Sequence, residues 1–313
     1  MCKKMISIIC NTYNQEKYIA DALESFLMQE VSVPFEILVH DDASTDATAD
    51  IIRKYEKKYP DIIKPIYQTE NQYSKNVSIT AEIQIPRAEG KYIAFCEGDD
   101  YWSDPRKLQS QYDFMESHTK FSACCHAYSM VDKEKVLIEE RYDFSQNCVV
   151  PMSRLLGNQL EVPHFATLFV RKDILSDYTN PFLGKTSSDM TLRVFCATKG
   201  DIYYINKNMS CYRRFAAGSW TVQVGRTSEG MLDQFKQYIP FLEKLNRYTA
   251  GQYDEEIKKA LDDRLFQIDL LENNYRSARK RTAYKTTSAK RKLYIFCGCI
   301  CPRFVTFIRK KLK

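Results

Sequence analysis

The chain has 313 residues, of which 44% are hydrophobic, which is ample for a core. The length only slightly exceeds the usual limit for a single core, so we expect one body with an appended tail or two closely packed subdomains. Its formal charge of +6 is unevenly placed. From Arg276 to Lys313 there are 13 Lys and Arg and no acidic residue, which leaves 33 basic and 40 acidic residues in the first 275. The basic charge therefore belongs to the C-terminal tail, and the rest of the chain is acidic.

The N-terminal residues MCKKMISIICNTYN contain an apolar run of only about six residues and no small-residue cleavage site, unlike a signal peptide. We therefore expect a cytosolic protein whose eleven cysteines are reduced. Cys297, Cys299 and Cys301 form the one cysteine cluster that resembles a metal site. Their spacing matches no common zinc pattern and no histidine lies nearby, so apolar filling is the preferred interpretation.

The first hundred residues alternate between strand and helix patterns. Apolar runs predict buried strands at 5–10, 35–40, 62–67 and 91–96, and amphipathic segments predict helices at 16–29 and 46–59. Ser44 or Thr45 is available to cap the second helix. Strands separated by helices favour right-handed crossovers and a parallel sheet.

The pattern changes after residue 102. We expect a helix from Asp104 and Pro105 to about residue 118, with proline in its first turn. Further strands are predicted at 121–131, 164–170 and 201–212, and helices at 188–200 and over much of 228–281. The expected organisation is one domain over 1–225, with halves at 1–105 and 106–225, followed by a helical C-terminal region at 226–313.

Two acidic clusters close predicted strands: HDDASTD at 40–46 and EGDDYW at 97–102. In open α/β sheets, ligands bind at the carboxyl ends of the strands, so both clusters are expected at a ligand-binding edge. Adjacent aspartates repel one another unless a cation or hydrogen-bond donors compensate them. A divalent metal and a nucleotide are therefore the expected partners of this edge.

Three ordered segments carry a family resemblance: SIICNTYNQEKYIADALESFLMQ, then EILVHDDASTDAT, then GKYIAFCEGDDYW with DPRKL. Together they resemble the inverting glycosyltransferases of family 2, closely over 5–115 and more loosely over 115–225. The resemblance implies an α/β fold of the GT-A type, in which a nucleotide-binding sheet is flanked by helices. By this resemblance residues 1–105 bind the nucleotide sugar, and the mixed half at 106–225 binds the acceptor. A helical, basic C-terminal tail follows them.

The resemblance places the nucleotide on the first acidic cluster. Asp42, with Asp41 beside it, matches the family's strand-end aspartate, which accepts a hydrogen bond from the nucleobase. An ionised carboxylate only accepts hydrogen bonds, which suits the imide N–H of uracil and favours UDP as the carrier. The alternative is a turn that caps a helix, which fits Ser44 and Asp46 better than the two aspartates before them.

The second acidic cluster resembles the family's metal motif. By this resemblance Asp100 is the direct ligand of Mn²⁺ or Mg²⁺, and Asp99 adds to the metal site and contacts the ribose or donor sugar. Such a cation stabilises the negative charge that develops on a departing diphosphate. A solvated acidic turn is the alternative. The family's first-strand loop, which cradles base and ribose, is matched by Asn11, Thr12, Tyr13 and Asn14, for which an ordinary polar loop is the other interpretation.

Inverting transfer needs a base that takes the proton of the acceptor hydroxyl. Asp189 matches the family's catalytic acidic motif at the start of a predicted helix, although Ser188 replaces the acidic residue that often precedes it. Helix capping is the alternative role for Asp189. Further on, Arg213 or Arg214 is a candidate for pairing with phosphate, or else is solvated, and Phe215 stands where the family often has a histidine.

The tail has apolar stretches at 293–300 and 303–308, shorter than the roughly 18 to 20 residues that span a membrane. Basic residues flank both stretches, which predicts an interfacial segment on an anionic membrane surface. Nucleic acid is not an expected partner, because no recognition-helix, stacking or zinc-finger signature accompanies the charge.

Together these features predict a metal-dependent inverting glycosyltransferase at the inner face of the plasma membrane. It would move a sugar from a nucleotide donor, with UDP favoured, to a hydroxyl of a glycan or lipid-linked acceptor in polysaccharide synthesis. The alternative is a non-catalytic homologue that binds a sugar nucleotide or glycan and lacks a usable base. His164 lies near the expected acceptor groove, but like the other three histidines it is expected to be packed or at the surface.

Overall fold

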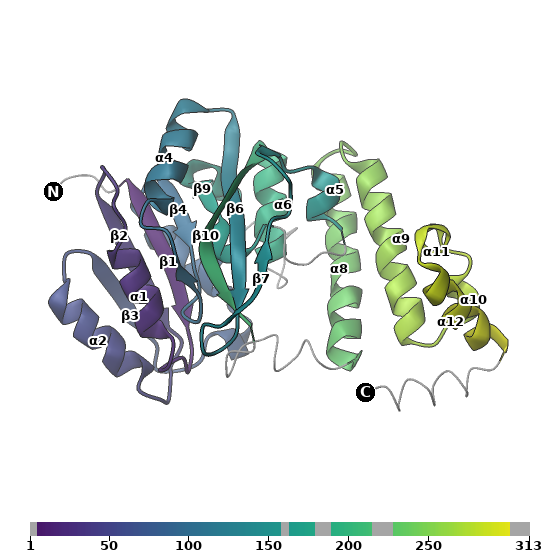
Figure 1. The fold of residues 1–313 in the computed structure, drawn as a ribbon, viewed down its shortest axis with the longest axis horizontal. Helices are drawn as coiled ribbons and strands as arrows, with labels where there is room; N and C mark the ends of the chain where they lie inside the picture. The colour runs from purple at the N-terminus through teal and green to yellow at the C-terminus, as the bar shows by residue number, and fades with distance from the viewer. Residues whose placement is uncertain (1–4, 158–162, 179–188, 215–227, 301–313) are drawn as a thin grey trace. The chain divides into compact units, whose positions relative to one another are not determined.

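A computed structural model describes residues 5–157, 163–178, 189–214 and 228–300 of the protein (Figure 1). The chain divides into two compact units. The first consists of Met1–Pro151 with Glu161–Gln223, and the second of Met152–Leu160 with Val224–Lys313. All of the described strands lie in the first unit.

The first part of the first unit alternates strand and helix, as the sequence predicts. In chain order it contains β1 (Ile6–Thr12), α1 (Ile19–Leu27), β2 (Phe35–Asp41), α2 (Thr48–Lys58), β3 (Ile63–Tyr67) and β4 (Tyr92–Phe95). Strand β1 pairs in parallel with β2 and β4, and β2 pairs in parallel with β3. These strands are apolar over most of their length because helices cover the sheet, with α1 and α2 together on one face (Figure 1).

Two local expectations about this part differ from the structure. The N-cap of helix α2 is Ala47, not Ser44 or Thr45, and Oδ1 of the preceding Asp46 accepts from the N–H of Thr48 at 2.9 Å. Between β3 and β4 the chain forms three short helical segments that the sequence analysis does not predict. They are η1 (Tyr73–Lys75), η2 (Ile79–Gln84) and α3 (Ile85–Arg87).

The second part of the unit is mixed. It contains β5 (Tyr101–Trp102), α4 (Lys107–Ser117), β6 (Phe121–Val131), β7 (Leu137–Arg141), β8 (Cys148–Val149), η3 (Phe165–Thr167), β9 (Phe169–Arg171), η4 (Lys172–Asp177), α6 (Asp189–Lys199) and β10 (Asp201–Arg213). The described strands form one sheet in the order β3-β2-β1-β4-β9-β6-β10-β5, with β7 on β6 and β8 on β10. Strand β9 pairs antiparallel to β4 and so joins the two parts.

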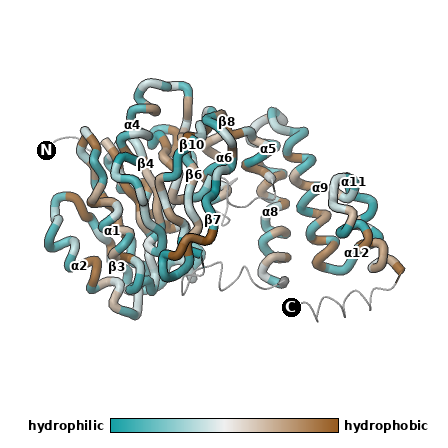
Figure 2. Tube along the Cα trace, in the orientation of Figure 1, coloured by the Kyte–Doolittle hydropathy of each residue, from teal (hydrophilic) through white to brown (hydrophobic). Residues whose placement is uncertain are grey.

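The predicted strand at 164–170 is only partly right, because its first half forms η3 and the strand begins at Phe169. The hairpin from β6 to β7 is unpredicted. The residues at the start of β7 are hydrophobic (Figure 2), and Val136, Leu137 and Ile138 are all exposed.

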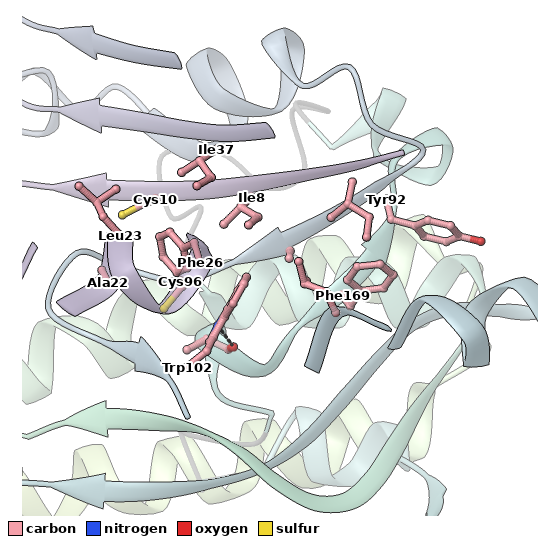
Figure 3. Packing of buried hydrophobic residues seen from close by; sticks show 14 of the residues in the cluster. Ile8, Cys10, Ala22, Leu23, Phe26, Ile37, Tyr92, Cys96, Trp102 and Phe169 are labelled. Carbon is pink, nitrogen blue, oxygen red and sulfur yellow. Dashed lines mark hydrogen bonds between the residues drawn. The ribbon is translucent and has the colours of Figure 1, made fainter. Parts of the chain in front are cut away.

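One hydrophobic cluster fills the space between the sheet and α1 (Figure 3). Ile8 and Cys10 of β1 are fully buried, as are Leu23 and Phe26 of α1. The rings of Phe26 and Trp102 lie 4.7 Å apart, so β5 is packed onto α1 directly after the second acidic segment. This packing fixes the backbone on both sides of that segment.

The second unit is helical, as predicted for 228–281. It contains α5 (Met152–Leu155), α8 (Ser228–Tyr248), α9 (Asp254–Leu271), α10 (Tyr275–Ala278), α11 (Thr282–Thr286) and α12 (Ala289–Ile300). Ile295 of α12 is fully buried in a cluster with Phe266 and Tyr275. Leu293, Phe296 and Ile300 are exposed at spacings that place them along one side of the helix. Among the described residues, no helix is both long and apolar enough to cross a bilayer.

Lys107 is a fully buried cation at the start of α4. Its Nζ lies 4.0 Å from the ring centroid of Trp102 and donates to Oε1 of Gln111 at 2.8 Å. Burial lowers the pKa of the ammonium group from 10.5 to about 7. Because this pKa is lower in the folded chain, the unfolded chain holds the extra proton between pH 7 and 10.5, and stability should rise with pH in that window.

Replacing this lysine should therefore change how stability depends on pH. We expect the free energy of unfolding of Lys107→Met to exceed that of the wild type by the largest amount below pH 7. Above that pH the difference should shrink by up to about 1.4 kcal/mol per pH unit. Denaturant unfolding at a series of pH values measures the difference. Lys120→Met, at an exposed lysine, is the control and should follow the wild-type pH dependence. Parallel curves for wild type and Lys107→Met would show that Lys107 stays charged in the folded protein.

Candidate functional site

The structure brings the first-strand loop and both acidic segments to one edge of the sheet. Strands β1, β2 and β4 run parallel, so their carboxyl ends coincide. The N–H of Asp42 donates to the carbonyl of Thr12, and the N–H of Gly98 donates to the carbonyl of Asn11, both at 3.0 Å. Main-chain hydrogen bonds thus tie each acidic segment to the end of β1.

Three carboxylates gather at this edge. Oxygens of Glu97, Asp99 and Asp100 all lie within 4.8 Å of one another. Asp99 and Asp100 are buried, and Glu97 is half-buried. Gly98 permits the arrangement, since a Cβ at this position would lie 2.8 Å from Cβ of Thr12 in the first-strand loop. The glycine therefore lets the acidic segment pack directly on β1.

Burial and mutual repulsion act together on these carboxyls. Burial raises the pKa of Asp99 to about 6. It raises the pKa of Asp100 well above the ordinary value, and the charge of Asp99 adds to the effect. The pKa of Glu97 is also raised well above its usual range, by burial first and by Asp189 second. Three oxygen donors whose charge the protein leaves poorly compensated are a set that suits Mg²⁺ or Mn²⁺.

Asp100 has a neighbouring group on each of its oxygens. Its Oδ1 accepts from the main-chain N–H of Arg213 at 2.8 Å. Its Oδ2 lies 3.9 Å from Nε2 of His164, a buried histidine that the sequence analysis left without a specific role. Asp100 is therefore fixed on Oδ1 by a main-chain hydrogen bond and faced on Oδ2 by an imidazole.

Arg213, one of the two candidates for pairing with phosphate, is buried and pairs with a carboxylate of the protein, and phosphate pairing stays a prediction. Its guanidinium is buried, donates to Oδ2 of Asp21 at 2.8 Å, and lies 4.5 Å from the ring centroid of Tyr18. Nε and Nη1 have no hydrogen-bond partner among the described residues. Arg213 thus donates its main-chain N–H to Asp100 and pairs its guanidinium with Asp21, and its charge also opposes the rise in pKa of Asp99 and Asp100. Arg214 follows β10 and is half-buried, and phosphate pairing by its side chain stays a prediction.

The two aspartates of the first acidic segment accept hydrogen bonds from different parts of the chain. Oδ1 and Oδ2 of Asp42 accept from the N–H groups of Gln72 and Tyr73, at 2.7 and 3.1 Å. Oδ2 of Asp41 accepts from the N–H of Ser44 at 3.3 Å, and burial raises the pKa of Asp41. Asp42 therefore holds the η1 loop, while Asp41 supports the turn before α2. Binding of a nucleobase by either carboxylate stays a prediction.

Three of the four residues in the first-strand loop brace neighbouring loops. Nδ2 of Asn11 donates to Thr80, Oγ1 of Thr12 donates to Gln15, and Oδ1 of Asn14 accepts from the N–H of Thr45. Asn14 has a positive φ of 52°, a conformation that asparagine tolerates better than most residues. The ring of Tyr13 is 41% exposed, so it is the member of this loop that is open to a ligand.

Asp189 is the first residue of α6 and is exposed to solvent. Although the residue as a whole is exposed, the surrounding protein buries its carboxyl group and so raises its pKa, while the charge of Arg193 opposes this shift. Asp189 in turn raises the pKa of Glu97 and of Asp100, which places its carboxylate within electrostatic reach of the acidic cluster. Ser188 and Phe215 lie outside the described residues.

The structure adds residues that the sequence analysis did not single out. Glu97 belongs to the cluster of carboxylates that could hold a metal, and its spacing from Asp99 in EGDD is the pattern in the sequence that indicates this. Asp21 pairs with Arg213, and its Oδ1 accepts from Nζ of Lys135 at 2.6 Å. Nothing local marks Asp21, because an acidic residue in the first turn of an amphipathic helix is ordinary.

Comparisons with curated proteins give related sequences. An uncharacterized protein of Mycobacterium tuberculosis is 32% identical over 223 residues, which cover 69% of this chain and 60% of that protein. The Escherichia coli protein WfaP, named UDP-Glc:alpha-D-GlcNAc-diphosphoundecaprenol beta-1,3-glucosyltransferase, is 34% identical over 134 residues, 43% of this chain and 49% of that protein. The chain thus spans about 60% of the length of the mycobacterial relative.

Solved structures match the fold. TarS residues 1–349 of Staphylococcus aureus, in complex with UDP-GlcNAc, superpose with a TM-score of 0.63 at 20% identity and cover 92% of this chain and 77% of that one. The mannosyltransferase PcManGT of Pyrobaculum calidifontis, in complex with GDP-Man and Mn²⁺, has a TM-score of 0.51 at 16% identity and covers 95% and 86%. The predicted α/β fold of the GT-A type is confirmed.

A family model described as "Glycosyl transferase family 2" matches residues 7–183. This range contains the first-strand loop and both acidic segments. Since it is more than half of the sequence, the chain belongs to glycosyl transferase family 2.

Proposed function

We propose that this protein is a metal-dependent inverting glycosyltransferase that transfers a sugar from a UDP-sugar to a hydroxyl of a glycan or lipid-linked acceptor in cell-surface polysaccharide synthesis. The observation that carries the proposal is the cluster of Glu97, Asp99 and Asp100 at the carboxyl ends of β1 and β4. In a doubly wound sheet this edge binds the ligand. Buried carboxylates that repel one another are costly for a fold to keep unless they bind a cation.

The metal assignment follows from the donor set. Asp100 and Asp99 would hold Mn²⁺ or Mg²⁺, with Glu97 adjacent, because hard divalent cations prefer carboxylate oxygen. When bound, such a cation supplies Lewis acidity toward the departing diphosphate. PcManGT in complex with GDP-Man and Mn²⁺ shows that a protein of similar fold binds this kind of ion.

The donor assignment rests on the first acidic segment and the loop of β1. Asp42 would accept from the imide N–H of uracil, with Tyr13 against the base or ribose, and UDP is favoured because a carboxylate cannot donate. Both oxygens of Asp42 already accept main-chain hydrogen bonds, but a carboxylate has about four acceptor sites in total. The names of WfaP and of the TarS complex both include UDP-sugars, which supports this choice.

Asp189 would act as the general base. Asp189 is an exposed residue at the start of α6, and its charge acts on the carboxyls of the acidic cluster. The acceptor hydroxyl would lose its proton to Asp189 while its oxygen attacks the anomeric carbon, and the diphosphate would leave from the opposite face. Residues 1–225 would contain the whole of this chemistry.

Residues 226–313 would hold the enzyme at the cytoplasmic face of the plasma membrane. On α12 the exposed Leu293, Phe296 and Ile300 form an apolar side, and Lys290 to Lys292 stand at its beginning. This combination is typical of a helix that lies in the interface of an anionic bilayer. The acceptor named for WfaP is linked to diphosphoundecaprenol, which fits an enzyme that works beside a membrane.

The metal role predicts the effect of removing one charge. Asp100→Asn should keep the fold but lose most turnover and most of the Mn²⁺-dependent affinity for UDP, because an amide does not balance the charge of a cation. Asp99→Asn should lose less. Calorimetric titration of UDP with and without Mn²⁺ measures the effect, and Asp113→Asn, at an exposed aspartate of α4, is the control. Mn²⁺-dependent turnover at the wild-type level in Asp100→Asn would refute the assignment.

The base role predicts a loss in kcat with donor binding retained. Asp189→Asn should lower kcat by about 10²- to 10⁴-fold while the affinity for UDP-sugar barely changes. Steady-state kinetics and donor titration separate the two quantities. Asp201→Asn, at the exposed start of β10, is the matched control. A variant that loses stability but keeps its specific activity would make Asp189 a helix cap only.

The membrane role predicts that the exposed side chains of α12 contribute to membrane binding and that the buried Ile295 does not. Because Ile295 is in a core cluster, the double substitution Leu293→Ser/Phe296→Ser is a better test than removal of the whole helix. We expect weaker sedimentation with anionic vesicles, poor binding to neutral vesicles by all forms, and unchanged transfer to a soluble acceptor. Met231→Ser, at an exposed methionine of α8, is the control. Equal sedimentation of the double variant and the wild type would exclude α12 as the anchor.

A further inference from the structure

His164 lies against the acidic cluster, and the proposed reaction does not use it. Its Nε2 is 3.9 Å from Oδ2 of Asp100, while the other oxygen of that carboxylate accepts from the N–H of Arg213. The imidazole is buried and comes from η3, a segment that is distant in sequence from both partners. Asp100 is thus approached by a fixed group on each oxygen.

The hydrogen bonds of the ring identify its tautomer. The main-chain N–H of Ala166 donates to Nδ1 of His164 at 3.3 Å. A nitrogen that accepts a hydrogen bond carries no proton, so in the neutral ring the proton is on Nε2. The nitrogen that faces Asp100 is therefore an N–H donor and not a lone pair available to a metal.

The ring is also held in place by its surroundings. It packs against Tyr212 and Tyr128, with ring centroids 4.4 and 5.0 Å away. The backbone of η3 is fixed from the other side, since Nε1 of Trp102 donates to the carbonyl of Ala166 at 3.1 Å and Nε2 of Gln111 donates to the carbonyl of Thr167 at 2.9 Å. Trp102, the last residue of the second acidic cluster, and Gln111 of α4 thus support the segment next to His164.

We propose that His164 is a positioning residue, whose Nε2–H holds Oδ2 of Asp100 and fixes the orientation of that carboxylate for a divalent cation. The inference rests on the proposed function in one respect, namely that Asp100 is a cation ligand. The separation of 3.9 Å is longer than the roughly 2.7 to 3.2 Å of an N–H···O hydrogen bond. Such contacts are often long in ligand-free sites and shorten when the ligand binds. Partners that orient a metal ligand typically change metal affinity by about 10- to 100-fold.

Three substitutions separate hydrogen-bond donation from packing. His164→Phe keeps a ring between the two tyrosines and removes the donor. His164→Gln removes the ring, but its amide N–H₂ reaches the position of Nε2. His164→Asn has the same amide, which reaches only the position of Nδ1. The full-length protein and each variant are titrated with Mn²⁺ alone by calorimetry, and thermal unfolding is recorded for each.

We expect His164→Phe to unfold near the wild-type temperature and to bind Mn²⁺ about tenfold more weakly, and His164→Gln to bind it more tightly than His164→Asn does. If His164→Phe does not fold, the comparison of Gln with Asn decides. Wild-type affinity in His164→Phe, or equal affinity in the Gln and Asn variants, would overturn the positioning role and leave the proposed function intact. Absence of Mn²⁺ binding by the wild-type protein would overturn both.

Discussion

The crowding of three carboxylates at one buried edge constrains the rest of the site. Charges that are taken out of water cost several kcal/mol each unless other charges or hydrogen bonds offset the loss. Here the protein compensates only in part: the main-chain N–H of Arg213 donates to Asp100 and the charge of its guanidinium, which pairs with Asp21, opposes the rise in pKa of Asp99 and Asp100, yet both pKa values stay raised. A fold selected for stability alone would not keep this arrangement. Such local conflicts are expected where the chemistry of a bound ligand depends on them.

The scaffold keeps these carboxylates from moving apart. Gly98 packs against β1, Trp102 packs against Phe26 of α1, and the hydrogen bonds of Trp102 and Gln111 fix η3. Each support is either a main-chain contact or a buried side chain, both of which lose little entropy when a ligand binds. Repulsion among the acidic groups is thus opposed by packing, so the site is prepared for a cation before the cation arrives.

The sequence predicts the first half of the fold well, because β1 to β4 are apolar runs and the acidic segments end two of them. It fails where distant residues decide the structure. Arg213 pairs with Asp21 across 192 positions, and no local pattern reveals that the arginine is buried. His164 faces Asp100 only because the 3-10 turn η3 replaces the start of the predicted strand. Spacing alone therefore locates the carboxylates but not the groups that hold them.

The uneven charge of the chain bears on how the proposed enzyme would meet a membrane. The first 275 residues are acidic, so an anionic bilayer would repel them, and the attraction must come from the basic residues after Arg276. Salt at 0.1 M screens both the electrostatic repulsion and the electrostatic attraction over roughly 10 Å. It does not screen the hydrophobic gain from burying Leu293, Phe296 and Ile300 in the bilayer interface. The apolar side of α12 would therefore determine binding at physiological salt, and the basic residues would select the lipid surface on which it occurs.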